Sequence, residues 1–129
     1  MAEPWKYSAI YNVNAFMQYR TAEKDIDRYI ALRPDDPFGH DVKGFLLYRL
    51  GKYSESIDAL ERAVALDPQD GYAYALMARD YAMLARRASD WRRQGYADRA
   101  REMRRRAGSV RSPDARRLAW LDAWLGRRL

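Results

Sequence analysis

The sequence has no cysteine, a single histidine and no long apolar run. The lack of cysteine excludes a disulfide-stapled secreted miniprotein, a thiolate metal site and a cysteine nucleophile. No stretch approaches the roughly 18 apolar residues that cross a bilayer, and residues 1–30 contain no uninterrupted apolar core of a signal peptide. A chain of 129 residues can bury one hydrophobic core. We therefore expect one domain over residues 1–129, in a soluble cytoplasmic protein without a membrane span.

Catalytic motifs are equally scarce. The sequence contains no Gly-rich phosphate loop, no HExxH motif, no Cys/His pair and no GxSxG motif. Acidic pairs such as Asp35 and Asp36 fall in predicted turns, where carboxylates usually cap helices. The sequence thus predicts that the protein is not an enzyme and that it uses no metal or cofactor.

Positive charge is concentrated in the last third of the chain. Residues 1–85 hold 10 Lys/Arg against 13 Asp/Glu, whereas residues 86–129 hold 14 Arg against 5 Asp/Glu. Such a segment is an anion-binding surface, the solvated exterior of helices, or a surface that docks onto the chain's own acidic first part or onto an acidic partner. Consecutive arginines spread around a helix, which favours the second interpretation. The candidate residues for an anionic partner are Arg86, Arg87, Arg92, Arg93, Arg101, Arg104 and Arg105.

The chain repeats itself at a spacing of 34 residues, which superposes Pro34 on Pro68 and Asp36 on Asp70. Both copies predict a helix that ends in Ala-Leu-x-Pro, because proline lacks an N–H and disfavours a helical residue before it. A period of this length is typical of stacked helical pairs.

The clearest copy, residues 37–70, predicts two helices. Asp36 is a suitable N-cap for the first, and Gly51 suits the left-handed residue that ends it. The second helix is expected from about Tyr53 to Leu66. Gly44 and Ser56 lie in mid-helix, and their small side chains predict a close helix crossing.

A third copy begins at residue 71. Its first helix is expected to be lengthened or kinked through residues 71–93, because a second-helix pattern resumes only at Gly95. A helix over about 96–107 would follow. A cap residue and a proline then predict a final helix over about 113–126.

Residues 37–70 resemble the tetratricopeptide repeat family, whose 34-residue pattern is W-x2-L-G-x2-Y, then A-x3-F, then A and P. The matching positions are Gly44, Gly51, Tyr53, Ala63 and Pro68. His40 takes the place of the family's Trp and is expected to be a packing residue, not a base or ligand. The resemblance implies an all-α solenoid, a right-handed superhelical stack of antiparallel helix pairs. It would hold about three repeats, near residues 3–36, 37–70 and 71–111, and a C-terminal capping helix.

The resemblance also implies a function. The family binds ligands on its concave face, mainly through four positions of each first helix. Carried over to this sequence, the groove residues are Tyr7, Tyr11, Phe38, Asp41, Phe45, Tyr48, Tyr72 and Arg79. Asp41 and Arg79 would be its polar anchors of opposite charge, although some of the rings could simply pack against neighbouring helices.

We therefore expect a non-catalytic adaptor or scaffold that binds a peptide, a partner protein or a second copy of itself. The alternative is binding of nucleic acid or an anionic surface through the Arg-rich last third.

Overall fold

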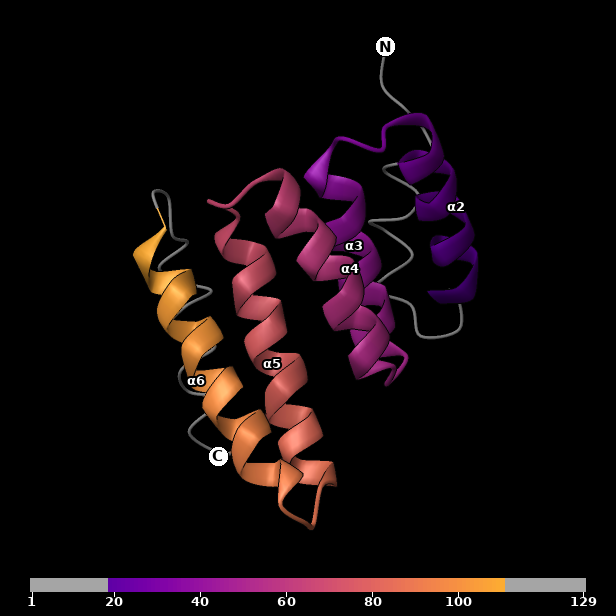
Figure 1. The fold of residues 1–129 in the computed structure, drawn as a ribbon. Helices are drawn as coiled ribbons and strands as arrows, with labels where there is room; N and C mark the ends of the chain where they lie inside the picture. Colours follow the sequence, from indigo (N-terminus) through magenta and orange to yellow (C-terminus); the bar gives the residue numbers. More distant parts are fainter. Residues whose placement is uncertain (1–18, 111–129) are drawn as a thin grey trace.

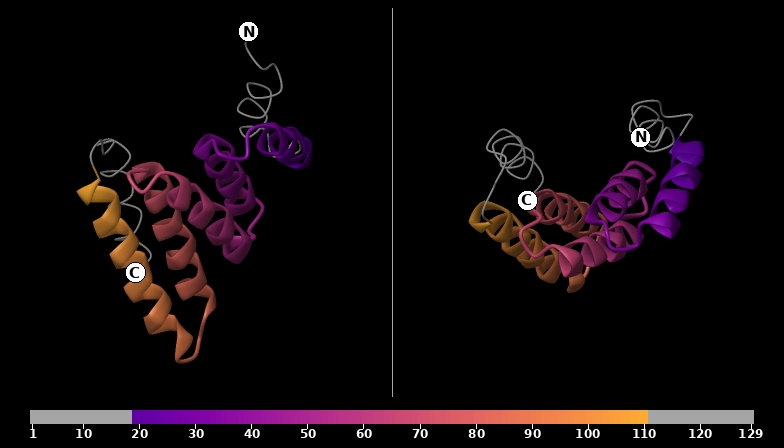
Figure 2. Two further views of the ribbon diagram at one scale, coloured as in Figure 1. Left: turned by 45° about the horizontal axis from the view of Figure 1, so that its top comes forward. Right: turned by 90° about the horizontal axis from the view of Figure 1, so that it is seen from above.

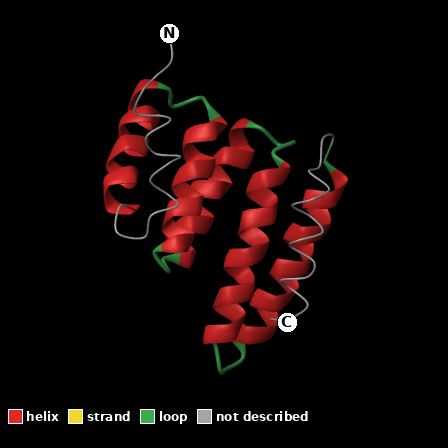
Figure 3. Ribbon diagram, turned by 180° about the vertical axis from the view of Figure 1, so that it is seen from behind, coloured by secondary structure: helices red, strands yellow, loops and turns green. Residues whose placement is uncertain are grey.

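The computed structural model describes residues 19–110. This range holds the helices α2 (Tyr19–Leu32), α3 (Pro37–Arg49), α4 (Tyr53–Leu66), α5 (Gly71–Arg87) and α6 (Arg92–Ser109), shown in Figure 1. Within it every residue is helical or lies in a connection, with no strand, as Figure 3 shows. The all-α prediction is confirmed. Tyr7, Tyr11 and the helix expected over 113–126 lie outside the described residues.

Successive helices pack against each other in antiparallel pairs. Each described helix contacts the next one along the chain, and α3 also contacts α5 directly. Seen from above in Figure 2, the helices follow an arc, with α3 and α5 toward its inner side. This arrangement is that of a tetratricopeptide-like helical repeat, as predicted, while the right-handed sense of the superhelix stays a prediction. None of the five described helices is both long and apolar enough to cross a membrane.

The ends of α3 follow from local chemistry. The Asp36 side chain accepts a hydrogen bond from the backbone N–H of Phe38 at 3.0 Å, with Pro37 in the first turn. At the other end Gly51 has a φ of 78°, in the left-handed region that favours glycine. The N–H of Lys52 then donates to the carbonyl of Leu47 at 2.9 Å, which closes the helix. The predicted bounds of α3 and α4 are confirmed.

The prediction for the third copy is wrong in its boundaries. The expected helix over 71–93 ends at Arg87, and α6 begins at Arg92, four residues before the expected start. The Asp90 carboxylate accepts a hydrogen bond from the N–H of Arg92 at 3.0 Å, and this local bond favours a turn over continued helix. Gly95, where the second-helix pattern was expected to resume, lies inside α6.

The core is divided between two clusters. The larger joins α4, α5 and α6 and includes Leu60, Met77 and Ala100. The smaller joins α2 and α3 around Ile26 and Leu46. The helices α4 and α6 both pack against α5. The remaining side of α5 therefore faces the inner side of the arc.

The close crossing of α3 and α4 is confirmed. A Cβ atom at Gly44 would lie 2.5 Å from the Cγ and Cδ2 atoms of Leu60. The hydroxyl of Ser56 lies 2.7 Å from the Gly44 carbonyl oxygen and 2.6 Å from Asp80 Oδ2. Asp80 is fully buried, so α3, α4 and α5 meet at one polar contact inside the core.

Candidate functional site

The predicted groove residues within the described range all lie on α3 and α5. We call this set the α3–α5 face: Phe38, Asp41, Phe45, Tyr48, Tyr72 and Arg79. All six are partly buried, and the two helices that carry them are in direct contact. Phe45 and Tyr72, 27 residues apart in sequence, pack against the same core cluster.

The rings of this face have packing roles as well. Phe38 makes an edge contact with Tyr29 of α2, with ring centroids 5.5 Å apart. Phe45 and Tyr72 each contact the larger core cluster. Phe38, Phe45 and Tyr72 are thus each anchored on one side by a core cluster.

Arg79 braces α5 against α3. Its Nη2 donates a hydrogen bond to the Tyr48 hydroxyl at 2.8 Å, and its guanidinium lies 4.2 Å from the centre of the Tyr48 ring. Burial lowers the pKa of Arg79, an effect that the hydroxyl partly opposes. The expected cationic anchor is therefore engaged with its own chain, and it positions Tyr48.

This contact belongs to a longer run of contacts between rings and guanidinium groups, which the sequence pattern did not predict. The rings of Tyr48 and Tyr53 lie 5.6 Å apart, and the Arg87 guanidinium lies 4.5 Å from the Tyr53 ring centre. Arg87 Nη1 also donates to the Gly51 carbonyl at 3.3 Å. We call Arg79, Tyr48, Tyr53 and Arg87 the cation–aromatic ladder. The sequence feature that could have indicated this ladder is the eight-residue spacing of Arg79 and Arg87, which places them on one side of α5.

Asp41 is paired with another acid. Its carboxyl lies near that of Asp70, which caps α5 by accepting from the N–H of Ala73 at 3.1 Å. Burial, the nearby Asp70 carboxyl and the charges of Asp67 and Asp36 together raise the pKa of Asp41 to about 10. Near neutral pH the Asp41 carboxyl therefore keeps its proton, so the face carries a neutral acid where a negative anchor was expected.

The residues weighed for catalysis have structural positions. His40 is buried, and its Nε2 lies 3.4 Å from the Pro34 carbonyl oxygen, as expected of a packing residue. Across residues 19–110 no three His, Cys, Asp or Glu side chains form a group that could hold a metal ion.

The Arg-rich residues of the last third are engaged to different degrees. Arg87 belongs to the ladder, Arg92 forms an ion pair with Asp90 at 2.9 Å, and Arg104 makes contacts of its own. Arg101 forms a longer ion pair, 3.5 Å to Asp98. Arg86, Arg93 and Arg105 are exposed. The patch is therefore discontinuous, with exposed arginines at the end of α5, near the start of α6 and further along α6.

Comparison with known families agrees with this geometry. Residues 37–70 match the sequence model of the tetratricopeptide repeat. A search among curated proteins gave no match. The chain therefore contains a tetratricopeptide repeat, as predicted, and this repeat comprises α3 and α4. Such repeats are in general non-catalytic modules that mediate protein–protein interactions.

Proposed function

We propose that the chain is an adaptor that binds a peptide or helical segment of a partner protein on the α3–α5 face. The observation that carries the proposal is the row of partly buried aromatic side chains on two adjoining first helices of a tetratricopeptide-like array. Aromatic rings held by a core provide apolar contact area at low entropic cost, which is the composition of interface hot spots.

The polar groups of this face support an uncharged mode of recognition. The raised pKa of Asp41 means that this carboxyl adds no negative charge to the face near neutral pH. Arg79 is held against Tyr48 and so keeps that ring in a fixed orientation. Such an arrangement suits an apolar segment of the partner.

The test is a double substitution, Phe45→Ala with Tyr72→Ala, in the full chain. Once a pull-down from the source organism has identified a partner, we expect the pair to weaken its binding by roughly 30-fold or more in a calorimetric titration. Because both rings also contact the core, the melting temperature should fall modestly while the helical circular-dichroism signal is kept.

The matched control is Leu66→Ala, which removes an apolar side chain that is 40% exposed on α4, away from this face. It should leave the affinity unchanged. Unaltered binding by a folded Phe45→Ala, Tyr72→Ala variant would refute the proposed site.

A further inference from the structure

The connection between α5 and α6 projects beyond the rest of the described array. The two helices have 17 and 18 residues, whereas α3 and α4 have 13 and 14. The extra turn of each helix carries residues 88–91 past the connection between α3 and α4, at the lower end of Figure 1. This end of the molecule is separate from the α3–α5 face.

Trp91 lies at this projecting end with 85% of its surface exposed. Its backbone is already helical, with φ −57° and ψ −22°, and its side chain makes no capping bond. The neighbouring Asp90 caps the start of α6 by accepting from the N–H of Arg92 at 3.0 Å. The helix therefore does not account for the indole, and large exposed aromatic side chains are enriched at protein interfaces.

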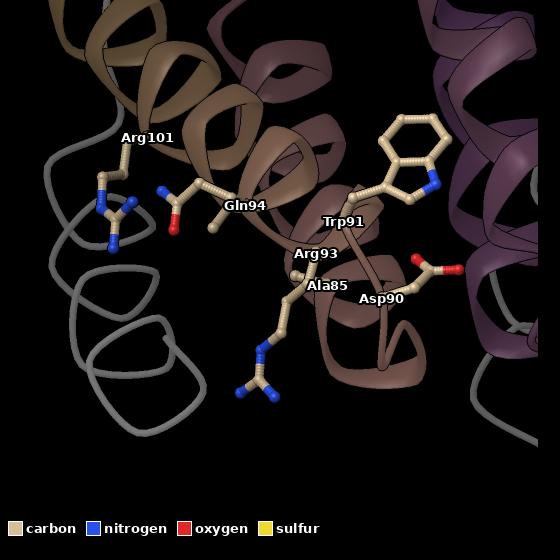
Figure 4. A pocket seen from close by; sticks show the side chains of 7 residues that line it. Ala85, Asp90, Trp91, Arg93, Gln94 and Arg101 are labelled. Atoms are coloured by element: carbon tan, nitrogen blue, oxygen red, sulfur yellow. The ribbon is translucent and has the colours of Figure 1, made fainter.

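A hollow of about 270 Å³ lies beside Trp91 (Figure 4). Its lining includes Ala85, Asp90, Trp91, Arg93, Gln94, Ala97 and Arg101. In Figure 4 the guanidinium groups of Arg93 and Arg101 point to one side of α6, and the indole of Trp91 projects from the start of this helix in another direction. The hollow thus combines apolar surface with two cationic groups.

The hollow carries net positive charge because Asp90, the acid in its lining, is ion-paired with Arg92. Asp90 receives hydrogen bonds from the Arg92 guanidinium at 2.9, 3.1 and 3.2 Å, and these bonds lower the pKa of Asp90. Arg93 forms no ion pair with any residue of the described range. Among residues 19–110 Arg101 forms one ion pair, with Asp98 at 3.5 Å, and its side chain is 57% exposed. Both guanidinium groups can therefore donate hydrogen bonds to an external carboxylate.

We propose that this hollow binds an acidic segment of a partner protein, with carboxylates on Arg93 and Arg101 and an apolar side chain against Trp91. Arginine pairs with carboxylates in a bidentate geometry, which gives orientation as well as attraction. The site is distinct from the α3–α5 face and does not rest on the function proposed above.

The spacing of Arg93 and Arg101 along α6 predicts how far apart the two carboxylates of the acidic segment should lie. Eight residues along a helix correspond to about 12 Å of rise. An extended peptide advances about 3.3 Å per residue, so the carboxylates should lie three or four positions apart. A nucleic acid strand would instead need cations along a continuous path, whereas Arg87, Arg92 and Arg104 are held by contacts within the chain.

The probe is a fluorescein-labelled synthetic peptide in which two Glu residues, three positions apart, flank a leucine. We expect it to bind the full chain in an anisotropy titration, and the same peptide with Gln in place of Glu to bind at least about tenfold more weakly. The double change Arg93→Ala with Arg101→Ala should weaken the Glu peptide about tenfold or more. Trp91→Ala, at an exposed position, should weaken it about fivefold without changing the helical signal.

The matched control is Arg86→Ala with Arg105→Ala, which removes the same charge from exposed positions outside the lining of the hollow. Its effect should stay below about threefold. Equal losses in the two double variants would show diffuse attraction and overturn the proposal. Tighter binding of an oligothymidine of equal charge, weakened by Trp91→Ala, would overturn it in favour of a nucleic-acid surface.

Discussion

The protonation state of the buried Asp80 carboxyl follows from the hydrogen-bond donors and acceptors around it. The Ser56 hydroxyl lies within hydrogen-bond distance of both the Gly44 carbonyl and Asp80 Oδ2. A serine hydroxyl has one proton and a carbonyl has none, so Ser56 can donate to only one of the two oxygens. A protonated Asp80 satisfies both contacts, because it donates to Ser56 while Ser56 donates to Gly44. In agreement, burial raises the pKa of Asp80 to about 8, although Ser56 and Arg79 oppose the shift.

We therefore predict that Asp80 makes the stability fall as pH rises. Its folded pKa of about 8 lies above the unfolded value of 3.8, so the folded state binds more protons between these values. The contribution of Asp80 is complete below about pH 4 and is lost as pH rises toward 8. In Asp80→Asn the free energy of unfolding, measured in urea, should decline less over this range, by up to roughly 1.4 kcal/mol per pH unit.

The asparagine amide can donate to Ser56 as the protonated acid does, so this variant should remain folded. Asp58→Asn is the control, since it removes an acid from the exposed side of α4. A pH profile of Asp80→Asn that runs parallel to that of the parent chain would show that Asp80 is ionised in the folded protein.

A second prediction at residue scale concerns two helical glycines. In Gly44→Ala the new methyl group would lie 2.5 Å from Leu60, which is fully buried and cannot move aside. We expect a loss of about 1–3 kcal/mol in the free energy of unfolding. Gly95→Ala in α6 meets no atom within 4 Å and should instead gain about 0.4–1 kcal/mol. Thermal or urea unfolding would measure both, and similar effects at the two sites would contradict the crossing geometry.

At the scale of elements, the sequence predicted helices wherever the ends are determined locally. Asp36, Pro37 and Gly51 each act within a few residues of the position they occupy, so the bounds of α3 and α4 could be predicted. The turn between α5 and α6 depends on Asp90, whose side chain competes with the helical backbone. The pattern placed the start of this helix after Gly95, but a glycine inside a helix costs only about 1 kcal/mol, which surrounding contacts can offset, and α6 begins at Arg92.

The contacts of the cation–aromatic ladder could not be predicted from the sequence. The tetratricopeptide pattern predicted the helices that carry Tyr48 and Arg79, but not that these two side chains satisfy each other. Their contact spans 31 residues, and it depends on the distance between α3 and α5, which no local pattern encodes. The pairing of Asp41 with Asp70 was missed for the same reason. Positions on the face could thus be predicted, whereas the charge state and role of the polar groups could not.

At the scale of the whole molecule, charge is distributed unequally along the array. Residues 19–70 carry 8 Lys/Arg and 11 Asp/Glu, whereas residues 71–110 carry 10 Arg and 4 Asp/Glu. The hollow at Trp91 therefore lies wholly in the positive half, whereas the α3–α5 face spans both halves. An acidic partner would approach the second half of the array preferentially, because long-range attraction acts before any contact forms.

The last prediction concerns how the array ends. Val110 is buried, and a Cβ atom at Gly71 would lie 2.8 Å from its Cγ2 atom, so the core extends at least to this residue. The sequence predicts a capping helix after it, over about 113–126, with Leu118 and Leu121 on its apolar side. Terminal units of repeat arrays need such a cover over their apolar surface. A chain ending at Val110 should then aggregate or lose cooperative thermal unfolding. A chain ending at Gly108 should be less stable still, by about 1–3 kcal/mol for the lost valine.

Point substitutions in the full chain can test whether the residues after 110 cap the array or merely extend from it. Leu118→Gln with Leu121→Gln should lower the melting temperature by several degrees, because polar groups would replace buried apolar contacts. Arg116→Gln with Arg117→Gln, on the same predicted helix, is the matched control and should leave it nearly unchanged. If the chain ending at Val110 is as soluble and as cooperative in calorimetry as the whole chain, the residues after 110 do not cap the array. They would then be free to serve as a partner-binding element.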